Sequence, residues 1–156
     1  MKTEVEYYKD IASKAIWLLS EHYTKECRDK GMSEDEADKE CDLIIIEKLG
    51  LYHYQLGGLM YNEGDSYEEY CAMQAENGEY AVSEAEYYEG VAEDAICALE
   101  PIYFAEECSK GNDEETADDI VMDRLIEDLD LSPYQLTDFF MHEYEPYDDY
   151  CAYCYD

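Results

Sequence analysis

The sequence predicts an all-α protein made of two tandem copies of one unit, each copy holding three to four helices. Three observations point to this fold class. The second half of the chain repeats the first half, the apolar residues follow helical spacing, and residues that cap helices precede each helical stretch. Sustained period-two alternation, the signal of a half-buried strand, is missing.

The repeat gives 27 identities over 76 aligned positions when residues 1–76 are set against residues 81–156 without a gap. Glu6-Tyr7-Tyr8 returns as Glu86-Tyr87-Tyr88, for example, and residues paired in this way are here called counterparts. Self-similarity at a fixed period indicates a duplicated unit, so we expect a first helical repeat at 1–80 and a second, more acidic one at 81–156. Because about 80 residues alone bury only a modest core, we expect the copies to pack together with pseudo-symmetry.

Each expected helix begins at a residue that can cap it. These caps are Thr3, Ser33 and Ser66 in the first copy and Ser83, Asp113 and Ser132 in the second. Gly31 and Gly111 supply the stop signals of the long first helices. Pro101 falls inside the long helix of the second copy and should kink or break it.

The buried faces of these helices follow from the spacing of apolar residues. In the long helix of the first copy they are Tyr8, Ile11, Ala12, Ala15, Ile16, Leu19 and Tyr23. In the next helix they are Ala37, Cys41, Ile45 and Leu49, matched by Ala117, Val121, Leu125 and Leu129. Several cysteines, among them Cys41 and Cys97, replace apolar residues of the other copy, so we expect them to act as small core residues.

The charge excludes several classes of function. The chain of 156 residues has 42 acidic and 10 basic side chains, a net charge of −32. Nucleic-acid binding through a basic face and docking on an anionic membrane both need surplus Lys or Arg. Yet 47% hydrophobic residues provide enough core material for a folded protein. Seven cysteines at irregular spacing and no apolar leader predict free thiols in the cytoplasm.

No set of residues indicates an enzyme, a cofactor or a metal. None of the three histidines has a histidine as its counterpart, and the chain lacks a nucleophile motif and a phosphate-binding glycine loop. Cys151 and Cys154 form one Cys-x-x-Cys pair without the second pair that a zinc site needs. We therefore expect no catalytic residues, no cofactor and no metal.

One segment resembles a known family. Leu129 to Phe140, followed by Tyr150, looks like the second half of an AraC-type helix-turn-helix, and Leu49 to Tyr70 is a fainter copy. The resemblance implies a second helix that enters the DNA major groove. Here that helix would present Gln135, Thr137, Asp138, Met141 and His142, with no Lys or Arg, so DNA binding is not expected.

The candidate site is acidic and lies in the second copy, which holds 23 acidic and 2 basic residues against 19 and 8 in the first. Four carboxylates recur at every fourth position of one helix, with three more beside them and only Arg124 nearby to offset them. The row is Glu115, Asp119, Asp123 and Glu127, and its neighbours are Glu114, Asp118 and Asp128. A second acidic and aromatic segment follows, with Glu143, Tyr144, Glu145, Tyr147, Asp148 and Asp149.

Carboxylates about one helical turn apart imitate the phosphates of a nucleic-acid backbone. The leading hypothesis is therefore a non-enzymatic inhibitor that occupies the cationic DNA or RNA channel of a CRISPR effector or restriction enzyme, as a phage protein in the host cytosol would. Rival hypotheses are an acidic chaperone for histone-like basic proteins, a degenerate helix-turn-helix interaction module, and acidity as an adaptation to salt or for solubility. The sequence leaves open whether the chain forms a homodimer.

Overall fold

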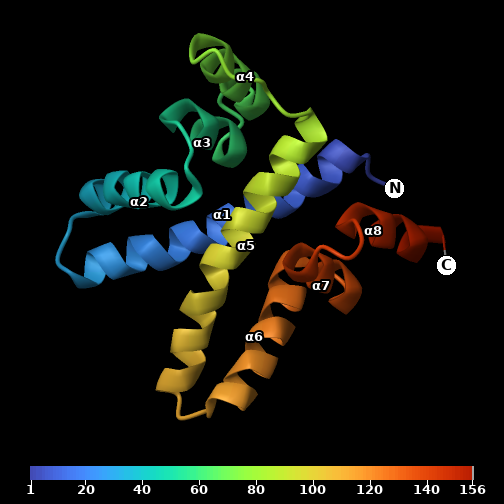
Figure 1. Ribbon diagram of the computed structural model, residues 1–156. Coiled ribbons are helices and arrows are strands. Elements are labelled where there is room, and N and C mark those ends of the chain that lie inside the picture. The colour runs from blue at the N-terminus through green and yellow to red at the C-terminus, as the bar shows by residue number, and fades with distance from the viewer. Residues whose placement is uncertain (156) are drawn as a thin grey trace.

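The structure is a computed structural model that describes residues 1–155 and contains eight α-helices in that range (Figure 1). They are α1 (Glu4–Asp29), α2 (Glu34–Leu49), α3 (His53–Met60), α4 (Ser66–Glu76), α5 (Glu84–Ser109), α6 (Glu114–Leu129), α7 (Pro133–Met141) and α8 (Pro146–Tyr155). No strand occurs among these residues, so the all-α prediction is confirmed. None of the helices in this range is both long and apolar enough to cross a membrane.

The helices of residues 1–80, here called the first half, and those of residues 81–156, the second half, have matching bounds. Each of α5 to α8 begins at the counterpart of the first residue of α1 to α4, respectively. α1 and α5 have 26 residues each, and α2 and α6 have 16 each. Any position in one half can therefore be compared with its counterpart in the other.

The predicted caps begin five of the helices. The side chains of Thr3, Ser33, Ser83, Asp113 and Ser132 each accept a hydrogen bond from the backbone N–H three residues later. Such a bond satisfies one of the free donors of the first turn. The predicted cap Ser66 is wrong by one residue, because Asp65 caps α4 through the N–H of Glu68. Ser66 is instead buried and hydrogen-bonds the Tyr87 hydroxyl at 2.7 Å.

The core is centred on the contact between the two long helices, which lie side by side near their N-termini and then diverge (Figure 1). Four alanines on this contact, Ala12, Ala15, Ala92 and Ala95, are fully buried. Their small side chains let the two helix axes approach closely. Larger residues such as Ile16, Leu19, Ile96 and Leu99 surround them with no exposed surface. The buried faces predicted from the spacing are confirmed, except that Tyr23 is only half-buried.

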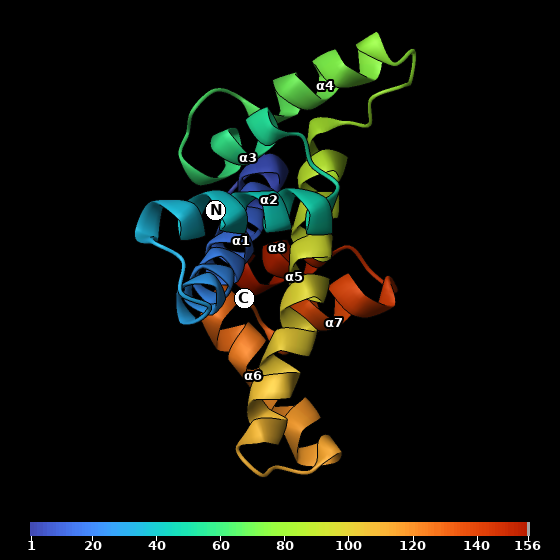
Figure 2. The same cartoon turned by 90° about the vertical axis from the view of Figure 1, so that its left-hand side faces the viewer.

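The shorter helices divide into two groups on the long pair. α2 packs on α1 and α6 packs on α5, and each is followed by two short helices (Figures 1 and 2). α4 contacts the N-terminal end of α5, and α8 contacts the N-terminal end of α1. Each half therefore places its last helix on the long helix of the other half.

Pro101 does not break its helix. α5 runs without interruption from Glu84 to Ser109 with Pro101 inside it. Pro101 lacks the N–H that would bond the Cys97 carbonyl four residues earlier. Both residues lie on the exposed side of α5, where solvent can satisfy that carbonyl. The same exposure shows that the predicted core role of Cys97 is wrong, although Cys41 is buried as expected.

The junction between α6 and α7 carries an unfavourable residue. Asp130 ends α6 in the left-handed conformation with φ 55°, where the first half has Gly50 at φ 63°. A side chain in this region is strained, and a carboxylate at a helix C-terminus opposes the helix dipole. We expect Asp130→Gly to raise the free energy of unfolding by about 1 kcal/mol in urea denaturation.

The reverse change is the matched control for this prediction. Gly50→Asp should lower the free energy of unfolding by a similar amount, because it places the same side chain at the same helix end. If both changes raise the free energy of unfolding, or if neither changes it, the left-handed conformation at this junction does not determine stability.

Candidate functional site

The predicted acidic residues of α6 lie on its solvent face. Ala117, Val121, Leu125 and Leu129 are buried against the core. Glu115, Asp119, Asp123 and Glu127, here called the α6 acidic row, are all exposed. At about 100° per residue the row lies on the side of α6 opposite the buried residues. The structure therefore presents all four carboxylates in one direction.

The spacing of these charges is close to that of a nucleic-acid strand. Seven carboxylates lie between Glu114 and Asp128. At 1.5 Å per residue they span about 21 Å, which is one carboxylate per roughly 3 Å of helix axis. One strand of B-DNA carries a phosphate per about 3.4 Å of its axis. The linear charge density of this helix thus resembles that of a single DNA strand.

Arg124 does not offset the row, contrary to the expectation from sequence. Its guanidinium turns toward α5, where it lies 2.9 Å from Glu106 and 3.5 Å from Glu107. It also stacks on the Tyr103 ring at 3.8 Å. Among residues 1–155, no salt bridge joins a basic side chain to any member of the α6 acidic row. Within residues 1–155, no ion pair therefore offsets the charge of the row.

The three neighbours of the row differ in what they contact. Glu114 is exposed in the first turn of α6, where a carboxylate favours the helix dipole. Asp118 is exposed beside Phe104 of α5. Asp128 accepts a hydrogen bond of 2.7 Å from Tyr103, and burial together with this bond raises the pKa of the Tyr103 hydroxyl. Asp128 therefore also links α6 to α5 through this hydrogen bond.

The four positions of α2 that correspond to the α6 acidic row carry less charge. The counterparts of the α6 acidic row are Asp35, Lys39, Leu43 and Glu47, and all four are exposed. Their charges sum to −1, against −4 for the row. Leu43, with 59% of its surface exposed, replaces Asp123. A helix of the same length and packing therefore exists in this chain without the acidic row.

The second predicted segment, from Glu143 to Asp149, divides between the surface and the protein body. Glu143, Tyr144, Glu145 and Asp148 are exposed. Tyr147 is half-buried, and its hydroxyl donates to the Lys2 carbonyl at 2.8 Å. Asp149 is also half-buried. The structure thus leaves only part of this segment available to a partner.

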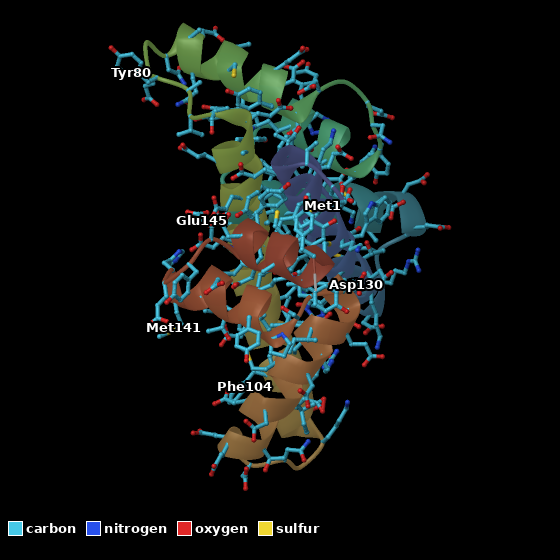
Figure 3. The ribbon with its side chains drawn as sticks, turned by 90° about the vertical axis from the view of Figure 1, so that its right-hand side faces the viewer. Met1, Tyr80, Phe104, Asp130, Met141 and Glu145 are labelled. Carbon is cyan, nitrogen blue, oxygen red and sulfur yellow. The ribbon has the colours of Figure 1, made fainter. Side chains whose placement is uncertain are left out.

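Glu145 belongs to a carboxylate pair that the sequence analysis missed. Its Oε2 atom lies 3.4 Å from the Tyr8 hydroxyl, and its negative charge acts on Glu89 of α5. Figure 3 shows Glu145 at the start of α8. Burial and the neighbouring Glu145 raise the pKa of Glu89 to about 7. The one sequence signal at Glu89 is the change of charge relative to its counterpart Lys9.

A second missed pair joins α7 and α8. Asp138 is 5% exposed, and the negative charge of Asp149 on α8 acts on it. Burial and this charge raise the pKa of Asp138 to about 6. The predicted helix-turn-helix surface is wrong at two positions, because Gln135 and Asp138 are both buried. The Oε1 atom of Gln135 accepts a hydrogen bond of 3.0 Å from the Tyr7 hydroxyl.

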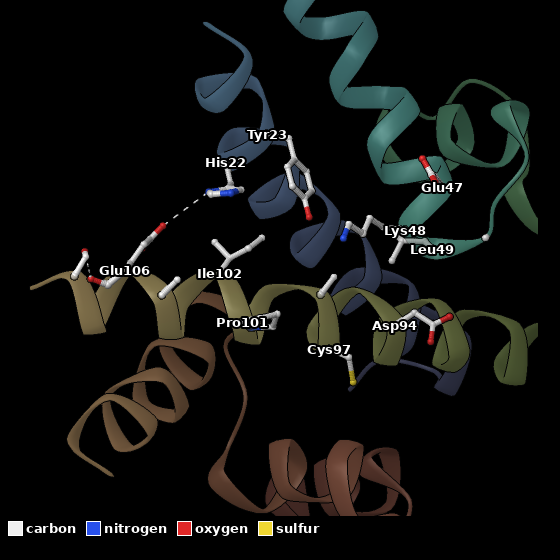
Figure 4. Close-up of a pocket in the computed structure, with 14 residues that line it drawn as sticks. His22, Tyr23, Glu47, Lys48, Leu49, Asp94, Cys97, Pro101, Ile102 and Glu106 are labelled. Carbon is white, nitrogen blue, oxygen red and sulfur yellow. Dashed lines mark hydrogen bonds and ion pairs between the residues drawn. The ribbon is translucent and has the colours of Figure 1, made fainter. Parts of the chain in front are cut away.

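A groove of about 1030 Å³ lies between α1, α2 and α5 (Figure 4). Its floor includes Pro101 and Ile102, and its lining carries Glu47, Asp94 and Glu106. His22 faces Glu106 across it at 3.9 Å. In residues 1–155 no three His, Cys, Asp or Glu side chains are arranged to hold a metal ion, in this groove or elsewhere.

Comparisons with known proteins gave no match. No protein-family model, curated protein or solved structure matches this chain.

Proposed function

We propose that this chain is a non-enzymatic acidic protein that binds the cationic DNA or RNA channel of a nuclease or other nucleic-acid-binding protein and inhibits it. The carrying observation is the α6 acidic row, four exposed carboxylates without a basic partner among residues 1–155. In this proposal the row occupies the positions that phosphates take in the channel. An anti-CRISPR or anti-restriction protein of a phage, acting in the host cytosol, fits this description.

The energetics of the free protein support the proposal. Like charges four residues apart on a helix destabilise it by about 0.2 to 0.5 kcal/mol per pair. The α6 acidic row contains three such pairs, and no salt bridge offsets them within residues 1–155. Lys and Arg side chains of a partner would relieve this repulsion on binding. Complementary charge also speeds association and makes it sensitive to salt.

Exposed aromatic side chains support the same kind of partner. Tyr144, Tyr153 and Tyr155 of the C-terminal segment are between 71% and 80% exposed. Tyrosine is favoured in protein interfaces, and its ring binds the guanidinium of Arg by cation–π contact. A surface that combines carboxylates with tyrosines is therefore suited to an Arg-rich channel.

We also infer that the chain arose by tandem duplication of one helical unit whose copies now pack with pseudo-symmetry. The gapless repeat and the matching helix bounds support this inference. In this history the two copies have diverged in charge, from a formal −11 in residues 1–80 to −21 in residues 81–156. The divergence concentrates acidity in the copy that carries the α6 acidic row.

The proposal predicts that neutralising the row weakens binding. The variant is Glu115→Gln, Asp119→Asn, Asp123→Asn and Glu127→Gln. It is tested as an inhibitor of DNA cleavage by a panel of restriction enzymes and CRISPR nucleases, with duplex DNA as competitor. We expect the wild-type protein to inhibit at least one enzyme and the variant to need at least tenfold more protein, which corresponds to about 1.4 kcal/mol. Its melting temperature should stay the same or rise, because repulsion is removed.

The matched control neutralises four exposed carboxylates of α2, namely Asp35, Glu36, Glu40 and Glu47, and so changes the net charge equally. We expect this control variant to inhibit the same enzyme at less than three times the wild-type protein concentration. Equal losses from both variants, or an inhibition indifferent to salt between about 50 and 500 mM, would contradict the proposal. Binding to a histone-like basic protein without inhibition of any nuclease would favour the acidic-chaperone alternative.

A further inference from the structure

The groove between α1, α2 and α5 is lined by apolar side chains from all three helices (Figure 4). Ala98, Ile102 and Ala105 line it from α5, four and three residues apart, so they share one face of that helix. Tyr23 of α1 and Leu49 of α2 line it from the other two helices. Ala105 is exposed, and Ala98, Ile102 and Tyr23 are half-buried. The groove therefore leaves apolar side chains in contact with solvent.

The groove has the length of a short helix. Its lining extends along α5 from Asp94 to Ser109. At 1.5 Å per residue this is about 22 Å, the length of a helix of about 15 residues. The groove lies where α1 and α5 diverge after their contact near the N-termini (Figure 1). Amphipathic helices bind such grooves through apolar residues three and four positions apart.

The charged side chains around the groove favour a cationic ligand. Glu47, Asp94 and Glu106 line it, and Lys48 is the one lysine or arginine among its described lining residues. Glu106 is paired with Arg124 at 2.9 Å. Glu47 and Asp94 have no basic partner within residues 1–155. Lys or Arg side chains of a ligand would compensate for these two carboxylates.

A smaller hollow of about 220 Å³ adjoins the groove toward the N-terminal end of α5. It shares Leu49, Gly50 and Asp94 with the groove, and Val82 and Glu86 extend its lining. No lysine or arginine is among the described residues that line this hollow. The apolar and acidic character of the groove thus continues beyond Asp94.

The small and acidic residues of the groove are particular to α5. At the equivalent positions α1 has larger or basic side chains in place of Asp94, Ala98 and Ala105. These are Lys14, Leu18 and Lys25, respectively. The chain itself therefore shows which side chains would fill the groove or reverse its charge.

We propose that this groove binds a basic amphipathic helix of a partner protein. Apolar side chains of that helix contact Ala98, Ile102 and Ala105, and its Lys or Arg side chains lie beside Glu47 and Asp94. A second copy of this chain fits less well, because two chains with a net charge of −32 repel each other. The groove is a different surface from the α6 acidic row, so the inference does not depend on the proposed inhibition of a nuclease.

The test measures the binding of a fluorescent peptide of about 16 leucines and lysines, arranged so that the leucines share one face of a helix. A comparison peptide has the same composition and charge, with its leucines distributed around the helix. Fluorescence anisotropy at about 0.3 M salt limits general attraction to the acidic surface. We expect the amphipathic peptide to bind the wild-type chain at least tenfold more tightly. Equal affinities for the two peptides would overturn the proposal.

Carbodiimide cross-linking of the wild-type chain then locates the peptide, because it couples a peptide lysine to a carboxylate in contact with it. We expect the cross-links to concentrate on Glu47, Asp94 and Glu86. Cross-links concentrated on the α6 acidic row would place the peptide there and contradict the proposal. A dimer in sedimentation that the peptide dissociates would assign the groove to a second copy, and this would also overturn it.

A groove-filling variant tests the apolar contacts at unchanged charge. Ala98→Leu with Ala105→Leu should weaken binding of the amphipathic peptide at least tenfold. Leu18 stands at the counterpart of Ala98, and Ala105 is exposed, so the fold should accept both changes. The control makes the same changes at exposed positions of α4, Ala72→Leu with Ala75→Leu, and should alter the affinity less than twofold. Wild-type affinity in the groove-filling variant would contradict the proposal.

A second pair of variants tests the charges and does not depend on how the groove-filling variant folds. Glu47→Gln with Asp94→Asn should weaken binding at least fivefold. The matched control, Asp35→Asn with Glu40→Gln, neutralises two exposed carboxylates of α2 outside the groove and should cost less than twofold in affinity. Equal losses from the two variants would show that the peptide responds to net charge alone, and the proposal would be wrong.

Discussion

Replacing Arg124 with alanine should lower the free energy of unfolding by about 2 to 4 kcal/mol. Glu107 is buried, with 4% of its surface exposed, and its carboxylate has two cationic partners. These are Arg124 at 3.5 Å and the more exposed Lys110 at 2.9 Å. The change removes one partner from a buried carboxylate and also the stacking on Tyr103. Urea denaturation followed by circular dichroism measures the loss.

The first half has two apolar residues at the positions that correspond to this ion pair. The counterparts of Glu107 and Arg124 are Cys27, which is buried, and Ile44. Replacing a buried ion pair with well-packed apolar residues is often neutral or stabilising. We therefore expect the double variant Glu107→Cys, Arg124→Ile to recover the stability lost in Arg124→Ala, at unchanged net charge. A double variant as unstable as Arg124→Ala would show that the ion pair itself is required.

A fragment of residues 1–83, which contains α1 to α4, should fold only as a dimer. Without α5 it would expose the face of α1 that includes Tyr8, Ile16 and Leu19, all fully buried in the whole chain. A second copy can cover this face, because Tyr8, Ala12, Ala15, Ile16 and Leu19 have identical counterparts in α5. We expect melting that depends on concentration and a dimer in sedimentation, measured near 0.3 M salt to screen the fragment's charge.

The matched control for the fragment is a change on the shared face. Ala15→Glu in the fragment should prevent the dimer and the helical signal together, because a charge would be buried at the contact. A folded, monomeric fragment whose melting does not depend on concentration would contradict the expectation.

Local signals in the sequence predicted most of the helices. Each cap bonds a backbone N–H only three residues later, so the local sequence is enough to predict it. These caps are Thr3, Ser33, Ser83, Asp113 and Ser132. The α6 acidic row was found for the same reason, since its spacing lies within one helix. Pro101 was misjudged because its effect depends on which side of α5 faces solvent.

Long-range contacts could not be predicted. The side chain of Arg124 turns to α5 because a buried carboxylate lies there at Glu107, 17 residues earlier in the chain. Asp138 was predicted on the surface of a short helix, but it is buried, and the charge of Asp149 on α8 acts on it. In both cases the deciding group lies on another helix, where spacing along the chain carries no information.

The aromatic contacts that hold α4 and α8 have very different consequences for folding. The Tyr67 hydroxyl reaches the Val82 carbonyl across 15 residues, whereas the equivalent bond from Tyr147 to Lys2 spans 145. Closing the longer loop costs more chain entropy, and contacts distant in sequence form more slowly. During synthesis from the N-terminus, the ring of Tyr7, on which Tyr150 of α8 stacks, therefore stays uncovered until α8 has left the ribosome. The packing of α1 is thus completed by α8, which is made after the other seven helices described here.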